Sequence, residues 1–437
     1  MAYLHLYNFI LVVASFFLLP FYGIKILLTG KYRKSIGPKL GIAVRLPADA
    51  LEGAPRIWVH AVSVGEVTAA APIVSALRDM FPQACIVLST STETGQEMAR
   101  RLVTAASACL YYPLDIPWVV RKALRTIRPD VFVPVETELW PNFIRICRQR
   151  GVRIVMVNGR ISPRSFTRYA RTRFFWKRLL AWVDEMGMIS AVDADRIMTI
   201  GAARGTVRVE GNAKYDSLAS RADDHLREEM GRTLNLPEGC PVFVAGSTHA
   251  GEERVVLSVY KKILAHHPDC ILIIVPRHIE RSAEILALAA DKGLSDCIRM
   301  SEIRKGRTRH DERIVLVDMI GELFKIYSLA TVVFCGGSLV PRGGQNILEP
   351  AAWGKVICYG PSMEDFLDEK RLLEDAGAGI TVHDEADLEA TLLHLLADPA
   401  GLVARGHAGR RVVTANKGAA RRYAQLIGAW LGAETNG

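Results

Sequence analysis

The stretch Cys270-Ile271-Leu272-Ile273-Ile274-Val275-Pro276-Arg277-His278 decides the fold class of this chain. Its first six residues are apolar and most are β-branched, and a proline, an arginine and a histidine follow at once. A short, continuous apolar run is typical of a strand that is buried on both faces, as in a parallel sheet covered by helices. The stretch therefore predicts a parallel α/β sheet with polar residues at the end of the strand.

Eight further runs share this character and alternate with helix-like segments. They are Ile57–Val59, Ile86–Ser89, Val131–Val135, Ile154–Val157, Val242–Ala245, Ile314–Val317, Val332–Cys335 and Val356–Tyr359. The strands form two series, separated by the polar and charged segment Ala213–Pro241, which we expect to be the hinge. The predicted fold is α/β, with two Rossmann-like, doubly wound parallel-sheet domains facing a cleft. We expect the domains at residues 36–212 and 213–437, with the C-terminal helix packing back on the first.

The composition favours a globular protein with an anionic partner. The chain has 437 residues, of which 50% are hydrophobic, and a formal net charge of +9. Such a charge suits nucleic acid, a phosphorylated substrate or an anionic membrane. The eight cysteines are scattered and form no CxxC motif, so we expect reduced thiols in the cytosol and neither a zinc site nor a disulfide framework.

The N-terminal segment has a different character. Leu6–Ile24 contains no Asp, Glu, Lys or Arg, which is close to the roughly 20 residues that a helix needs to span a bilayer. Basic residues follow from Lys25 onward, which predicts a membrane anchor over residues 1–28 with the rest of the chain in the cytoplasm. The alternative is a buried apolar helix, because Pro20 and Gly23 interrupt the segment.

In open α/β sheets, ligands bind beyond the carboxyl ends of the strands, so the residues after each strand carry the functional information. Ser63, Gly65 and Glu66 follow the first strand. Ser63-x-x-Glu66 fits a capping box, in which the glutamate only ties off its own helix. The start of a helix also keeps a carboxylate ionised, which suits a general base.

Two carboxylates, Glu136 and Glu138, follow the Val131–Val135 run. They fit a solvated loop, or a pair of acids whose pKa values are separated by their surroundings. In the second series, Arg277, Arg342 and backbone amides at helix starts could cradle a phosphate without a metal. The fingerprints GxGxxG and GxxxxGK[ST] are absent there. His249 and His278 have no ligand-spaced partner, so neither a metal nor a cofactor is expected.

The stretch Gly336–Pro350, GGSLVPRGGQNILEP, holds two glycine pairs around a basic turn. A loop that only reverses direction needs one glycine, so the pairs predict that something approaches the main chain closely.

A third feature is the segment Arg145–Arg178, which has no acidic residue and interleaves arginines with aromatic residues. It suits RNA, a plain solvated face, or a membrane surface bearing phosphates. The predicted anchor favours the membrane.

Taken together, six motifs resemble the 3-deoxy-D-manno-octulosonic acid (Kdo) transferase family of lipopolysaccharide assembly over nearly the whole chain. They are His60–Glu66, Glu136–Asn142, Asn158–Ser162, Gly211–Asp216, Pro276–His278 and Gly336–Pro350. The resemblance implies a GT-B glycosyltransferase that moves Kdo from CMP-Kdo to lipid IVA, the lipid A precursor, at the inner membrane. The transfer would invert the anomeric centre and need no metal. No nucleic-acid partner is expected.

The resemblance also implies roles for individual residues. Glu66 would be the general base, and Glu136 and Lys214 would stabilise the transition state. The implied donor-binding residues are Pro276, Arg277, Ile320, Gly321, Glu322, Gly336, Gly337, Asn346, Ile347, Leu348 and Glu349, with Glu349 accepting hydrogen bonds from the ribose. The implied acceptor-binding residues are Ser63, Gly65, Glu138 and Arg160. The family usually has histidine where this chain has Gln345, which cannot change its charge near neutral pH.

Two alternatives remain open at this point. One is a GT-B transferase that uses a UDP-sugar. The other is a non-catalytic, membrane-tethered module that binds anionic lipid or RNA through Arg148–Arg178. The polar loops after the strands favour an enzyme, because a scaffold has no need of them.

Overall fold

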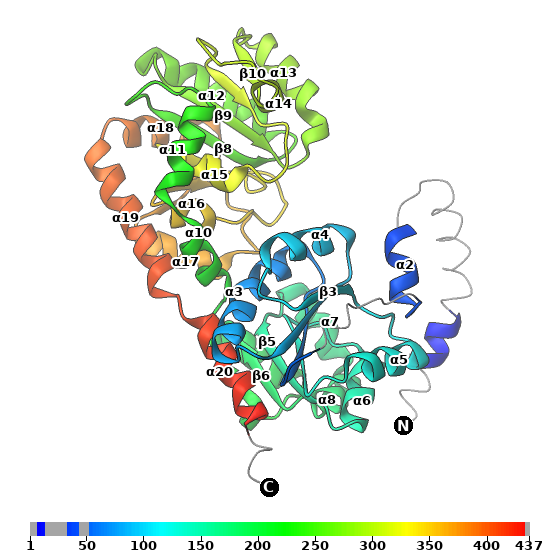
Figure 1. The fold of residues 1–437 in the computed structure, drawn as a ribbon. Helices are drawn as coiled ribbons and strands as arrows, with labels where there is room; N and C mark the ends of the chain where they lie inside the picture. The colour runs from blue at the N-terminus through cyan, green and yellow to red at the C-terminus, as the bar shows by residue number, and fades with distance from the viewer. Residues whose placement is uncertain (1–6, 14–32, 43–51, 433–437) are drawn as a thin grey trace. The chain divides into compact units, whose positions relative to one another are not determined.

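The computed structural model describes residues 7–13, 33–42 and 52–432 (Figure 1). Most of the predicted anchor at 1–28 lies outside these residues; residues 7–13 form a short helix. The helix α2 covers Arg33–Lys39. Within the described ranges, every helix is too short or too polar to cross a bilayer.

The chain forms two compact units. One comprises Met1–Ser217 with Lys417–Gly437, and the other comprises Leu218–Asn416. The chain passes between the units inside the segment that we expected to be a hinge, 213–241. That segment is largely helical, because it contains α10 (Lys214–Arg221) and α11 (Asp224–Thr233).

The first unit is built on a seven-stranded parallel sheet with the order β3-β2-β1-β4-β5-β6-β7. Its first six strands have the Rossmann order, and the order reverses between β1 and β4. The strands are β1 (Arg56–His60), β2 (Cys85–Thr90), β3 (Ala108–Tyr111), β4 (Val131–Pro134), β5 (Arg153–Gly159), β6 (Glu185–Met188) and β7 (Val207–Val209).

Helices cover both faces of this sheet, which explains the continuous apolar strands. Successive residues of β1 point to opposite faces: Ile57 and Val59 pack into one core and Trp58 into the other. The first core is completed by α3 (Val64–Met80), α4 (Glu93–Leu102) and α20 (Ala419–Leu431). The second is completed by α5 (Pro117–Ile127), α6 (Pro141–Gln149), α8 (Arg173–Leu180) and α9 (Ala191–Ile200), with α7 (Pro163–Arg171) at its margin.

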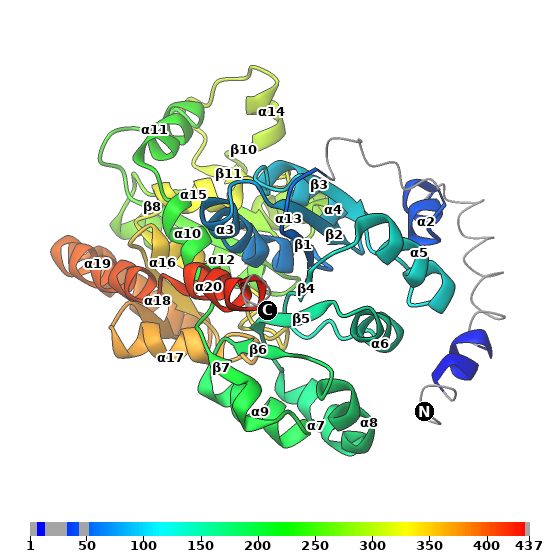
Figure 2. The ribbon, with the colours of Figure 1, turned by 60° about the horizontal axis from the view of Figure 1, so that its bottom comes forward.

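The last helix of the chain belongs to the first unit. Figures 1 and 2 show α20 beside α3, and its residues Tyr423 and Ile427 are fully buried in the first core. The Tyr423 hydroxyl donates a hydrogen bond of 2.7 Å to the carbonyl oxygen of Gly211. The C-terminal segment therefore forms part of the support for the loop that precedes α10.

The second unit repeats the plan with a sheet of order β10-β11-β9-β8-β12-β13-β14, again parallel throughout. The order reverses between β8 and β12. The strands are β8 (Val242–Thr248), β9 (Ile271–Pro276), β10 (Cys297–Arg299), β11 (Ile314–Leu316), β12 (Val332–Cys335), β13 (Val356–Tyr359) and β14 (Gly379–Thr381). Every residue of β9 is buried, as its apolar sequence predicts.

The helices of this unit follow the same alternation along the chain. They are α12 (Glu252–His266), α13 (Ser282–Asp291), α14 (Met300–Arg304), α15 (Leu323–Leu329), α16 (Leu348–Ala352), α17 (Leu367–Asp375), α18 (Glu385–Leu396) and α19 (Pro399–Ala415). The prediction of two doubly wound parallel sheets is confirmed. Each sheet has one point of reversed strand order, and Glu66, Glu136 and the glycine pairs follow strands that flank it.

Candidate active-site residues

Glu66 lies in the first turn of α3, directly after β1. One of its carboxylate oxygens, Oε2, accepts a hydrogen bond from the Val62 amide at 2.7 Å, and the other accepts one from the Ser63 hydroxyl at 3.1 Å. The side chain thus ties off the start of its own helix. Next to it, Gly65 is exposed, and a Cβ there would have no neighbour nearer than the Ser63 hydroxyl at 4.0 Å.

From its place at the start of a helix we expected Glu66 to be ionised. Its surroundings instead favour the protonated carboxyl group. Burial raises the pKa of Glu66 to about 8, and the nearby carboxylates of Glu136 and Glu138 act in the same direction. The hydrogen bond from the Val62 amide opposes this shift but is the smaller effect. A carboxyl group with a pKa near neutrality can accept a proton from a hydroxyl group and release it again.

Glu136 and Lys214 form an ion pair, with 3.1 Å between Glu136 Oε1 and Lys214 Nζ. About a quarter of each side chain is exposed. Glu136 follows β4, one of the two strands at the β1–β4 reversal of strand order. Its φ of 60° lies in the left-handed region, which is strained for a glutamate. The structure therefore holds this carboxylate at the carboxyl edge of the sheet against a local conformational preference.

Asn158 positions the residue before Lys214 and so helps to place Lys214 beside Glu136. From the sequence we assigned no role to Asn158. Its side-chain oxygen accepts a hydrogen bond of 2.9 Å from the Ala213 amide, and its own φ is 53°. Asn212 Oδ1 accepts one from the Lys214 amide at 3.0 Å. The signal was present in the sequence, because Asn158 follows an apolar strand and asparagine tolerates the left-handed region better than most residues.

Two further acceptor-binding candidates lie in the same loops. Glu138 has its pKa raised by burial, with a further contribution from the charge of Glu136. The Arg160 carbonyl accepts a hydrogen bond from the Thr137 hydroxyl at 2.9 Å, which joins the loop after β4 to the end of β5. Three carboxylates and Lys214 therefore share the carboxyl edge of the first sheet.

The glycine pairs in the second unit serve a purpose that we did not predict. All four of their amides are engaged within the chain: Gly336 with the Gly246 carbonyl, Gly337 with the Glu252 carboxylate, Gly343 with the Ser362 hydroxyl, and Gly344 with the Gly337 carbonyl. A Cβ at Gly336 would lie 2.6 Å from the Ser247 carbonyl oxygen. We expected these amides to be open to a ligand. That expectation is wrong, because other groups of the same unit approach them and accept their hydrogen bonds.

The segment after the glycine pairs starts α16, as predicted. Asn346 Nδ2 donates to Glu349 Oε1 at 3.2 Å, and the Asn346 carbonyl oxygen Oδ1 accepts from the Leu348 amide at 3.2 Å. Burial raises the pKa of Glu349, whereas the Arg221 guanidinium and Asn346 lower it. Ile347 and Leu348 are buried.

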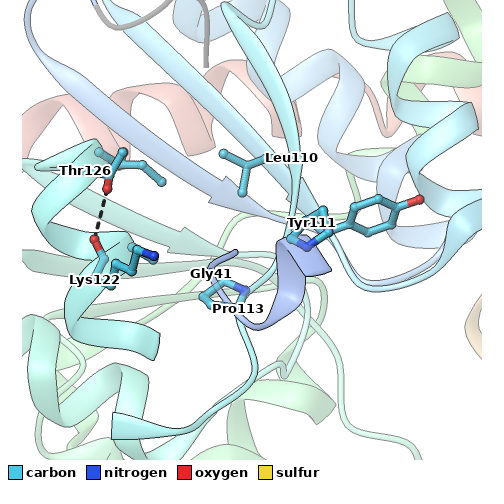
Figure 3. Close-up of a pocket in the computed structure, with 9 residues that line it drawn as sticks. Gly41, Leu110, Tyr111, Pro113, Lys122 and Thr126 are labelled. Atoms are coloured by element: carbon cyan, nitrogen blue, oxygen red, sulfur yellow. Dashed lines mark hydrogen bonds between the residues drawn. The ribbon is translucent and has the colours of Figure 1, made fainter. Parts of the chain in front are cut away.

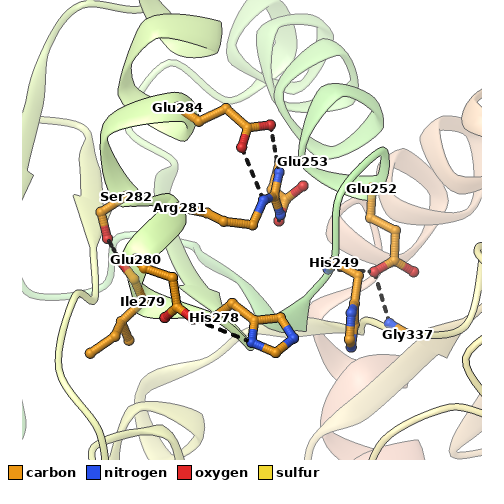
Figure 4. Close-up of polar contacts among 10 residues, drawn as sticks. All are labelled: His249, Glu252, Glu253, His278, Ile279, Glu280, Arg281, Ser282, Glu284 and Gly337. Atoms are coloured by element: carbon orange, nitrogen blue, oxygen red, sulfur yellow. Dashed lines mark hydrogen bonds and ion pairs between the residues drawn. The ribbon is translucent and has the colours of Figure 1, made fainter. Parts of the chain in front are cut away.

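Cationic side chains gather after β8 and β9. Arg277 and His278 are exposed, and the rings of His249 and His278 lie edge to face with 5.6 Å between their centroids (Figure 4). Burial lowers the pKa of His249, and the charges of His278, Arg342 and Arg277 lower it further. These four side chains are therefore near one another, and the positive charge of the region comes from Arg277 and Arg342.

The remaining donor candidates differ in their surroundings. Pro276 ends β9 and is buried, and Ile320 is 85% exposed. Gly321 has φ 94° and open space where a Cβ would be. Glu322 forms an ion pair of 3.2 Å with Arg304. A hydrogen bond that Glu322 accepts from a ligand would therefore compete with the one from the Arg304 guanidinium.

An apolar cavity of 160 Å³ in the first unit lies apart from all of these residues (Figure 3). It is bounded by α2, the end of β3 and α5, with Tyr111, Lys122 and Thr126 at its rim. In the described ranges, no group of three His, Cys, Asp or Glu side chains has the arrangement of a metal site.

Comparisons with known proteins bear on the family. Residues 34–217 match the model of the family described as 3-Deoxy-D-manno-octulosonic-acid transferase (kdotransferase). A 3-deoxy-D-manno-octulosonic acid transferase of Haemophilus influenzae is 30% identical over 427 residues, which are 97% of this chain and 98% of the relative. The transferase of the same name from Bordetella pertussis is 31% identical over 86% of this chain and 87% of its own.

Among solved structures, a UDP-GlcNAc 2-epimerase from Neisseria meningitidis, bound to UDP-GlcNAc, superposes with a TM-score of 0.59. It is 10% identical and covers 86% of this chain and 99% of its own. At that identity the likeness concerns the fold alone, and it agrees with two Rossmann-like units in one chain.

Proposed function

Since this chain belongs to the 3-deoxy-D-manno-octulosonic acid transferase family and is a glycosyltransferase, we propose that it transfers Kdo from CMP-Kdo to a hydroxyl group of lipid IVA. In this proposal the reaction inverts the anomeric centre, needs no metal and takes place at the cytoplasmic face of the inner membrane. The first unit binds the acceptor and the second binds the donor. The observation that carries the proposal is the buried carboxyl of Glu66, with its pKa near 8, beside the Glu136–Lys214 pair.

The proposed step begins with the acceptor hydroxyl. Glu66 takes its proton while the oxygen attacks the anomeric carbon of Kdo, and the bond from that carbon to the CMP phosphate oxygen breaks. The electron pair of that bond leaves with CMP. Holding the hydroxyl in line with the anomeric carbon can contribute roughly 7–11 kcal/mol to such a displacement.

Lys214 and Glu136 support this step from the same sheet edge. In our proposal the Lys214 ammonium stabilises negative charge that develops as the donor separates, while Glu136 holds that ammonium in place at 3.1 Å. One well-placed donor of this kind can be worth about 3–4 kcal/mol in the transition state. Ser63, Gly65, Glu138 and Arg160 surround the place where the acceptor sugar would bind.

On the donor side, we propose that side chains rather than glycine amides bind the CMP phosphate. Arg277 and Arg342 supply positive charge near His249, and the amides of both glycine pairs are already bonded. Glu349 would accept hydrogen bonds from the ribose, since its carboxylate accepts one from Asn346 and has capacity for more. Gln345 can donate and accept in the same region without a change of charge.

Membrane association is proposed for the first unit. Helices α7 and α8 carry exposed basic residues and an exposed aromatic residue, Phe174, which is 70% exposed. Their other aromatic residues, Phe166, Tyr169, Phe175 and Trp176, pack partly against the core and so fix the helices to the unit. A basic surface with an exposed ring suits phosphate head groups at the edge of a bilayer.

The direct test is to incubate the full chain with CMP-Kdo and lipid IVA in the presence of EDTA and to measure the product mass. We expect lipid IVA that has gained Kdo, and loss of this product in Glu66→Ala with CMP binding retained. Full turnover by Glu66→Ala would exclude the base assignment, and dependence on an added divalent metal would exclude the metal-free reaction.

Two alternative functions have distinct signatures. A transferase for UDP-sugars would bind UDP more tightly than CMP in a competition assay. A non-catalytic lipid or RNA module would show strongly salt-dependent binding that does not respond to changes at Glu66 or Glu349. We favour Kdo transfer, because the carboxylates and cations gather at the carboxyl edges of both sheets.

A further inference from the structure

The Glu252 carboxylate, at the start of α12, is saturated by backbone amides of the second unit. Its Oε2 accepts from the amides of His249 at 2.9 Å and Gly337 at 2.8 Å, and its Oε1 accepts from those of Ser338 and Leu339, both at 3.0 Å. The residue is 1% exposed. Four converging amides make an anion-binding nest of the kind that holds phosphate in other proteins. Here a side chain of the same unit fills it.

This arrangement joins the two loops on either side of the β8–β12 reversal. Gly337, Ser338 and Leu339 belong to the loop after β12, whereas His249 belongs to the loop after β8 (Figure 4). The main-chain amide of Glu252 also donates to the His249 carbonyl at 3.0 Å, so His249 is held from both sides.

The joined loops carry two side chains of the candidate donor site, His249 and Arg342. His249 contacts His278 edge to face, and the charges of Arg277 and Arg342 bear on the same ring. Arg342 lies in the loop after β12, five residues beyond Gly337. A change in the path of either loop would therefore move the side chains that face a bound phosphate.

We propose that Glu252 is a positioning residue for the nucleotide. Its buried carboxylate fixes the loop after β12 and the backbone of His249, so that Arg342 and His249 on these loops meet the phosphate in one fixed geometry. The identity of the nucleotide, CMP, rests on the proposed function. The tie between Glu252 and the loop does not.

The chain offers a matched control in the next residue. Glu253 is fully buried in the same first turn of α12, but its Oε1 pairs with Arg281 at 2.7 Å (Figure 4), and its Oε2 has no hydrogen-bond partner among the described residues. Glu252→Gln and Glu253→Gln thus each remove one buried charge at adjacent positions. Only the first places an NH2 group against amides that need acceptors.

The experiment has two measurements on the full chain. Hydrogen exchange of the amides at Gly337–Leu339, without ligand, should become faster in Glu252→Gln and stay unchanged in Glu253→Gln. Titration with CMP should give a dissociation constant about tenfold higher in Glu252→Gln, which is the effect of losing charge-assisted hydrogen bonds in the site. The KM for lipid IVA should change less than about twofold.

Each outcome decides the proposal. Faster exchange with unchanged CMP affinity would overturn the positioning role, and so would equal loss of CMP affinity in Glu253→Gln, which would indicate a general loss of stability. If Glu252→Gln does not fold, Glu252→Asp replaces it, because the shorter side chain keeps the charge but cannot reach all four amides. Failure of the unaltered protein to bind CMP would overturn the proposed donor, while the exchange data would still test the tie between Glu252 and the loop.

Discussion

The Lys214 ammonium lies 3.1 Å from the Glu136 carboxylate, although the two residues are 78 positions apart in the chain. Glu136 is held in a left-handed conformation after β4, and Lys214 begins α10. Asn158, at the end of β5, bonds the residue that precedes Lys214. The pair is therefore built by the ends of two neighbouring strands and a helix start, and not by chance contact of long side chains.

The first prediction concerns this pair. Lys214→Met should lower kcat by about 100-fold if the ammonium stabilises the transition state. Its effect on stability should be small, below about 1 kcal/mol, because the pair is partly exposed and screened by solvent. In the double variant Glu136→Gln with Lys214→Met, kcat should fall little further than in Lys214→Met, since the two side chains act as a unit. Steady-state rates and thermal denaturation measure both effects.

A suitable control is the ion pair Lys262–Glu389 in the second unit, with 2.6 Å between its charged atoms. It lies on helices α12 and α18 and contains none of the candidate site residues. Lys262→Met should leave kcat unchanged. An equal loss of kcat in this control, or strict additivity in the double variant, would contradict a shared role for Lys214 and Glu136.

The second prediction follows from the pKa of Glu66. A general base must be deprotonated to act, so kcat/KM should rise by about tenfold per pH unit below pH 8 and level off above it. The Glu138 carboxylate helps to raise the pKa of Glu66, so Glu138→Gln should move this rise to lower pH. A pH–rate profile of each protein measures the midpoint. A midpoint that stays near pH 4.5, the ordinary value for glutamate, would exclude Glu66 as the titrating base.

The third prediction concerns stability and needs no substrate. The pKa of Glu66 is about 8 in the folded protein and 4.5 at its ordinary value, so the unfolded chain releases the proton first as pH rises. The contribution of this residue to stability is therefore fully present below pH 4.5 and is lost as pH rises through 8. Glu66→Gln cannot ionise and escapes this loss.

We therefore expect the Tm of Glu66→Gln, relative to the unaltered protein, to increase between pH 5 and pH 8. The difference between the two proteins cancels the titration of all other groups. Glu97→Gln, on the exposed side of α4, is the control and should show a pH-independent difference. A flat difference for Glu66→Gln as well would mean that its carboxyl titrates normally in the folded state.

The sequence was sufficient for the inner part of each sheet and insufficient for its edges. The nine predicted runs correspond to β1, β2, β4, β5, β8, β9, β11, β12 and β13. The strands that were missed are β3, β7, β10 and β14, which are the edges of the two sheets, and β6, which lies next to an edge. Edge strands are short and partly exposed, as in Val207–Val209, so they lack the continuous apolar run that marks a strand buried on both faces.

The local sequence pattern also did not predict properties that depend on contacts between residues far apart in the chain. Ser63-x-x-Glu66 correctly suggested a side chain that ties off its helix, but the shift of the pKa comes from burial and from carboxylates about 70 residues away. Likewise, the glycine pairs indicated a close approach to the main chain, but the sequence could not show that Glu252, 85 residues before Gly337, is the group that approaches. Positions after strands were predictable, whereas their partners depended on the fold.

The last prediction tests whether the protein's own packing requires glycine at the first of these pairs. In Gly336→Ala, the new Cβ would lie 2.6 Å from both the Ser247 carbonyl oxygen and the Thr248 Cα, which are backbone atoms that cannot turn aside. The loop after β12 must move away from β8, at a cost of about 1–3 kcal/mol in the free energy of unfolding. Thermal denaturation measures this loss. Gly205→Ala is the control, because a Cβ there has no neighbour within 4 Å, and it should leave the stability unchanged. Gly336→Ala could instead be as stable as that control and bind CMP equally well. The chain's own packing would then not require glycine at this position, and close approach of the donor would explain the pair better.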